Sequence, residues 1–534
     1  MRSKQLISTP EILSGQTLVR HKQTFPWCIL SVFIWGLIAH AYGFLHCSLS
    51  HDYLNAFIAT TKEESAKIQV GRFFVPLYRS FFRNALGLPW LIGILGLTWT
   101  SAAVFLVCRL FRVHSKLLIV LISGIMTTNI SYISQIATYL HEFDANALAL
   151  LFSVLSAYLW SSEPLAIGEK PHPWLRALGA ALCTLVSLGI YQAFFAVTVT
   201  LIIGLSLRDL LEMESPKRVF LQGLRGIAIL LGGGLLYLLL RRVVYACTGL
   251  TPLTRTELFG DGQSILSLFL VKTGLYFWVT NVAHYAYHNM RLPFYVFGLA
   301  AVLLLITARR FFKKQYGPAR FVLALLLIIA MPFGMICVYF GAKGNNVHEI
   351  MIYAVWFFYI FLLLLAYRLH QLRPGIPEKI TRAAALVLVV CLLWQNVVLA
   401  NTAYSKKELE AASTLSTMTR VVSDLEHQDN YEYNQTPVAF FGIFDGNSYL
   451  LEYTGIRQIS GLEANTSLWG DEVTAYYNTY EAYFKFVLQY KIHLCDEALR
   501  QELANDPRVQ KMPAYPDKGY IQDIDGVLVV KFPN

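Results

Sequence analysis

The stretch FVLALLLIIAMPFGMICVYFG, residues 321–341, contains no Asp, Glu, Lys, Arg or His. About 20 consecutive apolar residues are enough for a helix to span the hydrocarbon core of a bilayer. Ten further stretches of similar character predict transmembrane helices at residues 27–47, 88–110, 117–137, 145–160, 174–190, 193–208, 219–240, 292–311, 350–368 and 383–401. Together, the eleven stretches predict an α-helical polytopic membrane protein.

The composition agrees with a membrane protein, because 55% of the 534 residues are hydrophobic, 15% are charged and the mean hydropathy is +0.48. The eight cysteines include no C-x-x-C pair, so they indicate neither a disulfide framework nor a zinc site. The sequence has no P-loop, no G-x-G-x-x-G after a strand, no H-E-x-x-H and no G-x-S-x-G. Nucleotide hydrolysis and zinc proteolysis therefore lack support.

The charge changes sign along the chain. Residues 1–401 hold 33 Lys and Arg against 15 Asp and Glu, a net charge of +18, whereas residues 402–534 hold 11 against 19, a net charge of −8. We therefore expect a cytoplasmic N-terminal segment over residues 1–26, a transmembrane domain over 27–401 and a soluble extracytoplasmic domain after it. In that last part, strand signals at 436–444 and 526–532 and a polar helical run predict a small α/β or α+β domain.

The basic excess lies in short loops between apolar stretches, where it is a topology signal and not a sign of nucleic-acid binding. With the N-terminus in the cytoplasm, 22 of the 33 basic residues before residue 402 fall inside. The odd number of helices then places the acidic tail outside, together with the loops at 48–87, 138–144, 241–291 and 342–349. Two outer segments, residues 73–88 and 265–287, mix aromatic, aliphatic and basic residues and predict helices in the membrane interface or re-entrant segments.

The first candidate site residue is Asp52, in the motif Ser50-His51-Asp52-Tyr53 just after the first predicted helix. A carboxylate at the end of such a helix is a functional candidate, and it can accept a hydroxyl proton as a general base. It can also cap the next interfacial helix, and the two roles are compatible. His51, which precedes it, is a candidate for substrate binding.

Further along lie the motif Gly71-Arg72-Phe73-Phe74 and the two acids Glu142 and Asp144. A guanidinium beside aromatic residues suits a phosphate held at the membrane surface, although an interfacial Arg can simply snorkel. The acids are expected in the outer loop 138–144. There a second acid can orient the base, bind a metal or hydrogen-bond sugar hydroxyls, although acids are also ordinary in solvated loops.

The remaining candidates are uncharged or cationic. Tyr191 and Gln192 interrupt an apolar hairpin at its predicted outer tip, and hydrogen-bonding groups of this kind recur in sugar sites. Arg291, Lys343 and His348 also fall on the outer side, where they can neutralise a lipid-linked phosphate. Arg291, Lys343 and His348 each have an alternative role as an interfacial anchor, so the three together predict substrate binding more strongly than any one of them.

Taken with His141-Glu142-Phe143-Asp144 and Gly189-Ile190-Tyr191-Gln192-Ala193-Phe194, these motifs resemble those of the bacterial glucosyltransferases that decorate O-antigen. The similarity is to the type II phage-encoded branch, within the GT-C superfamily, and it covers roughly residues 27–400. It implies a GT-C-like multi-pass inverting enzyme. Such an enzyme transfers glucose from undecaprenyl-phosphate glucose to a surface polysaccharide, on the periplasmic face of the bacterial inner membrane.

By the same resemblance, Asp52 is the base and Arg72 contacts the donor phosphate. Many GT-C enzymes have paired acids after the first helix, whereas here His51 precedes Asp52. This difference leaves open whether Glu142 or Asp144 supplies the second carboxylate. It also leaves open whether a divalent cation takes part.

Two other classes of protein fit the hydropathy pattern. A transporter or flippase for lipid-linked sugars also needs a polar path, but it is expected to carry charges near the middle of its helices. Here, most acids lie at helix ends on one side. An assembly partner whose outer domain binds polysaccharide without changing it leaves the acids on that side unexplained.

Overall fold

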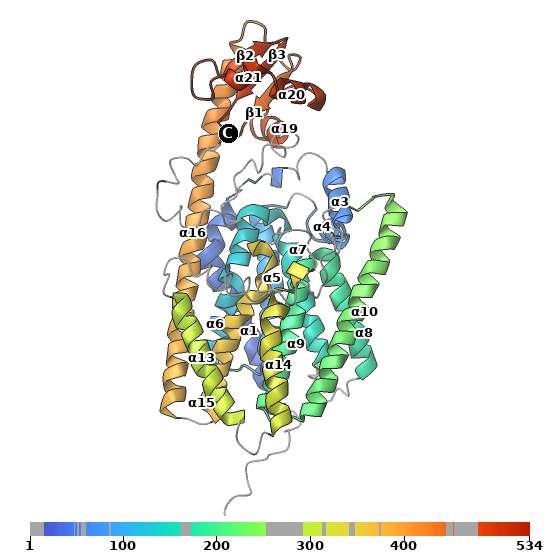
Figure 1. Cartoon of the computed structure of the whole chain (residues 1–534), viewed down its shortest axis with the longest axis vertical. Coiled ribbons are helices and arrows are strands. Elements are labelled where there is room, and N and C mark those ends of the chain that lie inside the picture. The colour runs from blue at the N-terminus through green and yellow to red at the C-terminus, as the bar shows by residue number, and fades with distance from the viewer. Residues whose placement is uncertain are drawn as a thin grey trace, which may run out of the picture.

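The computed structural model describes residues 15–46, 49–50, 53–54, 60–84, 87–161, 172–252, 292–311, 317–340, 348–372, 375–444, 452 and 479–533. Figure 1 shows a bundle of long helices with a small domain above one end, and helix α16 joins the two. We call the end of the bundle nearest the small domain the domain-side end.

Nine helices in the described part of the chain are long and apolar enough to cross a membrane. They are α1 (Gly15–Leu45), α5 (Pro89–Leu110), α7 (Ile130–Trp160), α8 (Pro173–Ile190), α9 (Phe195–Leu211), α10 (Pro216–Thr248), α14 (Pro318–Met335), α15 (Phe357–Leu372) and α16 (Ile376–Glu426). Two shorter apolar helices are α6 (Lys116–Thr128) and α13 (Leu292–Phe311). Every predicted stretch has a counterpart among them, so the prediction of a polytopic helical membrane protein is confirmed.

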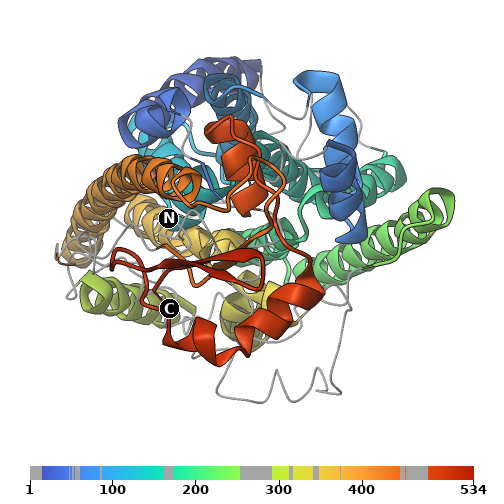
Figure 2. The same ribbon diagram turned by 90° about the horizontal axis from the view of Figure 1, so that it is seen from above.

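Helix α7 lies inside the bundle, and most of its residues are buried. Close packing is possible because Gly96 of α5 leaves room for the ring of Phe143 on α7, and small residues commonly allow such approaches between membrane helices. Helix α10 lies at the edge of the bundle in the view from above (Figure 2). Its side chains Leu231, Leu235 and Leu239 are exposed, as expected for a surface that faces lipid.

The turn between α6 and α7 lies at Asn129, which is extended (φ −71°, ψ 160°) and whose side chain accepts a hydrogen bond from the backbone N–H of Tyr132. A second break is at Tyr139, inside α7, where the backbone leaves helical geometry (φ −121°, ψ 40°). The prediction of a loop over residues 138–144 is therefore wrong, because residues 140–144 are helical and almost all buried. Their two carboxylates are paired with cations, Glu142 with Lys67 and Arg72 and Asp144 with Arg83, so they can be buried.

Two short helices, α3 (Thr60–Gln69) and α4 (Phe74–Phe82), lie at the domain-side end (Figure 1). Helix α4 is amphipathic: Leu77 and Phe81 are exposed, while Tyr78 and Arg79 are buried. The amphipathic helix that the sequence predicts within residues 73–88 is thus present. The other predicted interfacial segment, residues 265–287, lies outside the described residues.

The small domain contains a three-stranded sheet of order β1-β3-β2. Strand β3 (Val527–Lys531) pairs in parallel with β1 (Val438–Phe441) and antiparallel with β2 (Ile521–Ile524). The accompanying helices are α19 (Tyr480–Ala482), the π-helix η9 (Tyr483–Val487), α20 (Glu497–Ala504) and α21 (Pro507–Lys511). The strands predicted at 436–444 and 526–532 are confirmed, and the domain combines helices with a mixed sheet.

Helix α16 runs without interruption through positions 401–402, where we expect the domain boundary. Near its middle, the hydroxyl of Tyr404 is hydrogen-bonded to Nδ1 of His40 on α1, at 2.7 Å. Near its C-terminal end, Asp424 accepts a hydrogen bond from the hydroxyl of Tyr520, at 2.6 Å. The helix is therefore attached by side chains both to the bundle and to the small domain.

Candidate active site at the domain-side end of the bundle

The two motifs that begin at Gly71 and Gly189 pack against each other. The guanidinium of Arg72 lies 4.7 Å above the ring centroid of Tyr191, a cation–π contact. Gly189 is needed for this approach, because a Cβ atom there would lie 3.0 Å from Cε2 of Phe73. Segments far apart in the sequence thus form one site.

A glycine turn brings two cations together at the end of α3. The backbone N–H of Arg72 donates to the carbonyl of Lys67, and the N–H of Gly71 donates to the carbonyl of Ile68, both at 2.8 Å. Gly71 has a left-handed conformation (φ +80°), as the glycine of this helix C-cap requires. The cap places the residue after the glycine beside the last turn of the helix.

Side chains from two other elements hold the carbonyl groups of this turn. Tyr245 Oη donates to Gln69 O at 2.9 Å, Gln192 Nε2 to Val70 O at 3.0 Å, and Tyr237 Oη to Gly71 O at 3.3 Å. Gln192 belongs to the 3-10 helix η1 (Gln192–Phe194), and the two tyrosines belong to α10. The tyrosines are absent from the predicted site, although aromatic residues spaced by eight on one helix are a signal that could have found them.

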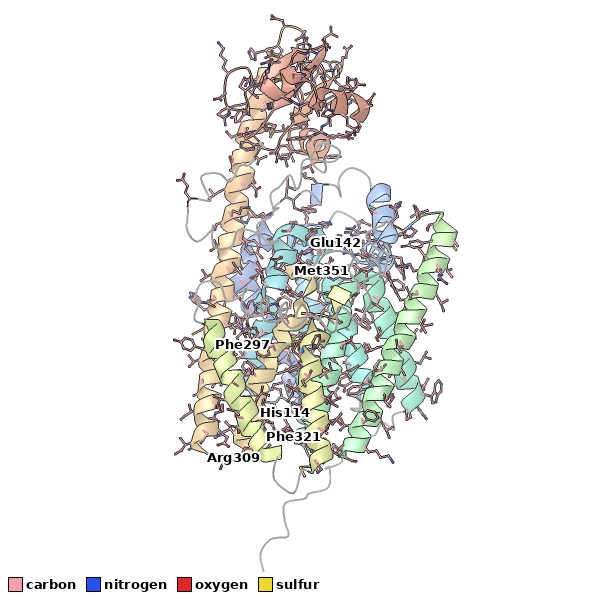
Figure 3. All side chains as sticks on the ribbon, viewed as in Figure 1. His114, Glu142, Phe297, Arg309, Phe321 and Met351 are labelled. Atoms are coloured by element: carbon pink, nitrogen blue, oxygen red, sulfur yellow. The ribbon has the colours of Figure 1, made fainter. Side chains whose placement is uncertain are left out.

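Glu142 is the acid that pairs with the two cations of this turn. Its Oε2 accepts a hydrogen bond from Nη1 of Arg72 at 3.0 Å, and its Oε1 forms an ion pair with Lys67. Glu142 is only 2% exposed and lies at the domain-side end of the bundle (Figure 3). Because two partly exposed cations share one buried carboxylate, the cluster of Lys67, Arg72 and Glu142 has a net charge of +1.

Asp144 is held by a different set of groups. Arg83 donates to both of its carboxylate oxygens, at 2.6 and 3.0 Å, and both side chains are completely buried. Tyr78 of α4 also donates to Asp144, at 3.0 Å, and burial together with this carboxylate raises the pKa of the Tyr78 hydroxyl. The same arginine donates to the carbonyl of His141. Asp144 thus joins α4 to α7.

The residues on either side of Asp52 link the bundle to the small domain. Ser50 Oγ donates to the carbonyl of Thr138 on α7, at 2.5 Å, and the N–H of Tyr53 donates to Ser50 Oγ at 3.2 Å. The ring of Tyr53 stacks on the imidazole of His141 in α7, with the ring centroids 5.4 Å apart. Leu54 packs with buried residues of the small domain and of the upper part of α16.

Four predicted site residues lie outside the described residues: His51, Asp52, Arg291 and Lys343. His348 is described and precedes the 3-10 helix η4 (Glu349–Met351). Ser131 of α7 donates to the backbone carbonyl of Glu349 at 2.6 Å, so this helix is attached to the first half of α7. The described candidates Arg72, Glu142, Tyr191 and Gln192 form one cluster, and Asp144 lies on the same helix as Glu142.

The acids of this region face cations. Within the described ranges, no three His, Cys, Asp or Glu side chains are grouped so that they could hold a metal ion. Both carboxylates instead form ion pairs, Glu142 with Lys67 and Arg72, and Asp144 with Arg83. A cationic cluster beside aromatic rings at one end of a membrane bundle is suited to an anion that carries an apolar chain.

The model of the family described as Glucosyl transferase GtrII matches residues 41–367, a range that includes the cluster around Arg72 and Glu142. No curated protein and no solved structure matches the chain.

Proposed function

We propose that this chain, which belongs to the glucosyl transferase GtrII family, transfers glucose from undecaprenyl-phosphate glucose to O-antigen, a surface polysaccharide. Membership of the family makes the protein a membrane glucosyltransferase, which uses a sugar donor and a glycan acceptor. The lipid-linked donor, the polysaccharide acceptor and the periplasmic face of the inner membrane are parts of the proposal.

The observation that carries the proposal is the charge of the cluster of Lys67, Arg72 and Glu142. It is positive by one unit and lies beside α4, whose exposed Leu77 and Phe81 suit the membrane interface. A lipid-linked sugar has its phosphate at this depth, since the lipid chain must stay in the bilayer and the sugar must reach water. Arginine matches phosphate oxygens with two parallel hydrogen bonds.

The opposite end of the bundle supports the proposed orientation. Arg309 lies there (Figure 3), and Glu212 pairs with Arg112 and Arg368, both at 2.9 Å. Short loops rich in Lys and Arg stay in the cytoplasm. The N-terminal segment 1–26 is then cytoplasmic, and the domain-side end and the small domain are periplasmic.

The proposed reaction is a single displacement with inversion. Asp52 accepts the proton of an acceptor hydroxyl, the oxygen attacks the anomeric carbon, and the bond from that carbon to the phosphate oxygen breaks. The electron pair of this bond leaves with the lipid phosphate, whose charge is met by Arg72 and Lys67. General-base assistance of this kind accelerates a reaction by about 10² to 10⁴.

The other acids have supporting roles in this mechanism. Glu142 holds Arg72 and Lys67 in place, and Asp144 positions α4 through Arg83. Tyr191 and Gln192 complete the wall of the site, and His51, Arg291, Lys343 and His348 stay candidates for substrate binding. In this proposal the acceptor reaches Asp52 from the side of the small domain, because Leu54, two residues further along the chain, packs with buried residues of that domain.

The test is glucose transfer by the purified protein in lipid nanodiscs, supplied with undecaprenyl-phosphate glucose and a polysaccharide acceptor. Asp52→Asn is expected to lower the turnover by about 10² to 10⁴ with unchanged folding. The exposed Asp429 offers a matched control, and Asp429→Asn should keep the wild-type rate. Wild-type turnover by Asp52→Asn would contradict the base assignment. Translocation of the lipid-linked sugar without any transfer would instead favour a flippase.

A further inference from the structure

Arg241 of α10 lies beside the turn that carries Arg72. Its guanidinium carbon is 5.8 Å from the ring centroid of Tyr237 and 5.9 Å from that of Tyr245, the two tyrosines that hold the turn. Its Cδ atom is 3.4 Å from the position that a Cβ atom on Gly71 would occupy. The three α10 residues are spaced by four, so they form one ridge facing the turn.

The charge of Arg241 is not neutralised by the described residues. Its Nε is buried and has no hydrogen-bond partner in the described part of the chain. The two buried carboxylates of the site already have their cations: Glu142 pairs with Lys67 and Arg72, and Asp144 pairs with Arg83. An arginine without a carboxylate, at the end of an apolar helix and held between two rings, is a costly arrangement unless it meets an anion.

We propose that Arg241 is a second phosphate-binding residue of this site and contacts the phosphate of the lipid-linked donor; this inference rests on the proposed function. Helix α10 exposes Leu231, Leu235 and Leu239 on a surface that suits lipid, and Arg241 follows them along the same helix. A lipid chain can therefore run beside the helix while its phosphate lies between Arg241 and Arg72.

Arg241 is expected to stabilise the leaving lipid phosphate more strongly than the bound donor, because the leaving phosphate carries more negative charge. Lys67, Arg72 and Glu142 sum to +1, and Arg241 raises the sum to +2. The donor phosphodiester carries one negative charge, whereas the lipid phosphate monoester that leaves carries about −1.5 to −2 at pH 7. Arg241 therefore stabilises the charge that develops on the leaving phosphate, and its loss should lower kcat as well as raise KM for the donor.

The experiment compares Arg241→Gln with Arg242→Gln, since Arg242 is the exposed neighbour on the same helix. With undecaprenyl-phosphate glucose, Arg241→Gln is expected to lower kcat/KM by about 10- to 100-fold, the effect of one charge-assisted contact. The inhibition constant of undecaprenyl phosphate should rise by a similar factor. Arg242→Gln should stay within about twofold of wild type. Unchanged donor kinetics and unchanged inhibition in Arg241→Gln would overturn the proposal.

Two further measurements complete the experiment. The first distinguishes a site for a lipid-linked phosphate from a site for free phosphate, and the second tests phosphate binding by Arg241 independently of glucose transfer. If inorganic phosphate inhibits the wild type as strongly as undecaprenyl phosphate does, Arg241 serves a free-phosphate site and the lipid assignment is wrong. Direct binding of radiolabelled undecaprenyl phosphate tests Arg241 even if the wild type transfers no glucose, which would contradict only the proposed function. Where Arg241→Gln does not fold, Arg241→Lys keeps the charge and the stem but loses the paired donors, so weaker lipid-phosphate binding with normal melting is still expected.

Discussion

Replacing Asp144 by Asn should release α4 from α7. The substitution keeps the volume of the side chain but removes the charge that Arg83 faces, and both side chains are completely buried. Breaking a buried pair from one side costs about 3 to 5 kcal/mol, because the other charge stays behind without its partner. Arg83 keeps its bond to the carbonyl of His141, so we expect the lower half of this range.

The assay is a double-mutant cycle on the free energy of unfolding, followed by circular dichroism during titration with a denaturing detergent. Arg83→Gln and Asp144→Asn should each destabilise the protein, and the double variant should lose less than the sum by about 2 to 3 kcal/mol. Additive losses, or a cost for Asp144→Asn within about 0.5 kcal/mol of zero, would refute the reasoning. A stable Asp144→Asn protein with lost turnover would assign Asp144 to the chemistry.

Three more outcomes follow from the packing and the charges. Gly189→Ala should lower glucose transfer and reduce the free energy of unfolding by about 1 to 3 kcal/mol, because the new methyl group collides with the aromatic rings packed on this glycine. Gly232→Ala is the control, because the space around Gly232 is open, and equal effects of the two substitutions would contradict the prediction. Arg508 of the small domain hydrogen-bonds to Asp506 and Asp525 and lowers the pKa of both carboxyl groups. The pairing therefore stabilises the fold at neutral pH, and this stabilisation is lost as the pH falls below about 4 and the carboxylates become protonated. Scanning fluorimetry should therefore show a shallower acid-side loss of melting temperature in Arg508→Ala; identical slopes would count against the pairing. Tyr404→Phe should cost about 1 to 3 kcal/mol in the same unfolding titration, since His40 loses a buried partner, and an unchanged unfolding midpoint would argue against that bond.

Helix α16 links the small domain rigidly to the bundle. It is a single helix of 51 residues, so a tilt of the small domain is transmitted to the bundle at the contact of Tyr404 with His40. The segment around Asp52 touches both parts, since Tyr53 stacks on α7 and Leu54 packs with the small domain. A tilt of the small domain therefore also acts on Tyr53 and Leu54, the described residues that follow the proposed base in the sequence.

The sequence alone determined the membrane class, the approximate positions of the apolar helices and the candidate motifs, because apolar length and charge placement are local properties of the chain. It did not reveal the turn at Asn129, which interrupts the helix predicted at residues 117–137. The same local signals predicted Arg72, Glu142, Tyr191 and Gln192, which the structure brings into one cluster. They failed for residues 138–144, because short polar runs between apolar stretches resemble loops, and a loop and a buried helix differ only in their partners.

Only the tertiary structure decided those partners. It pairs Glu142 with Lys67 and Arg72, and Asp144 with Arg83, whereas sequence patterns cannot say which acid meets which cation. It also brings Arg241 from a peripheral helix to the Gly71 turn. The physical reason is that ion pairs and ring contacts depend on distances across the bundle, which are set by how the helices pack together and are not encoded in any single stretch of sequence.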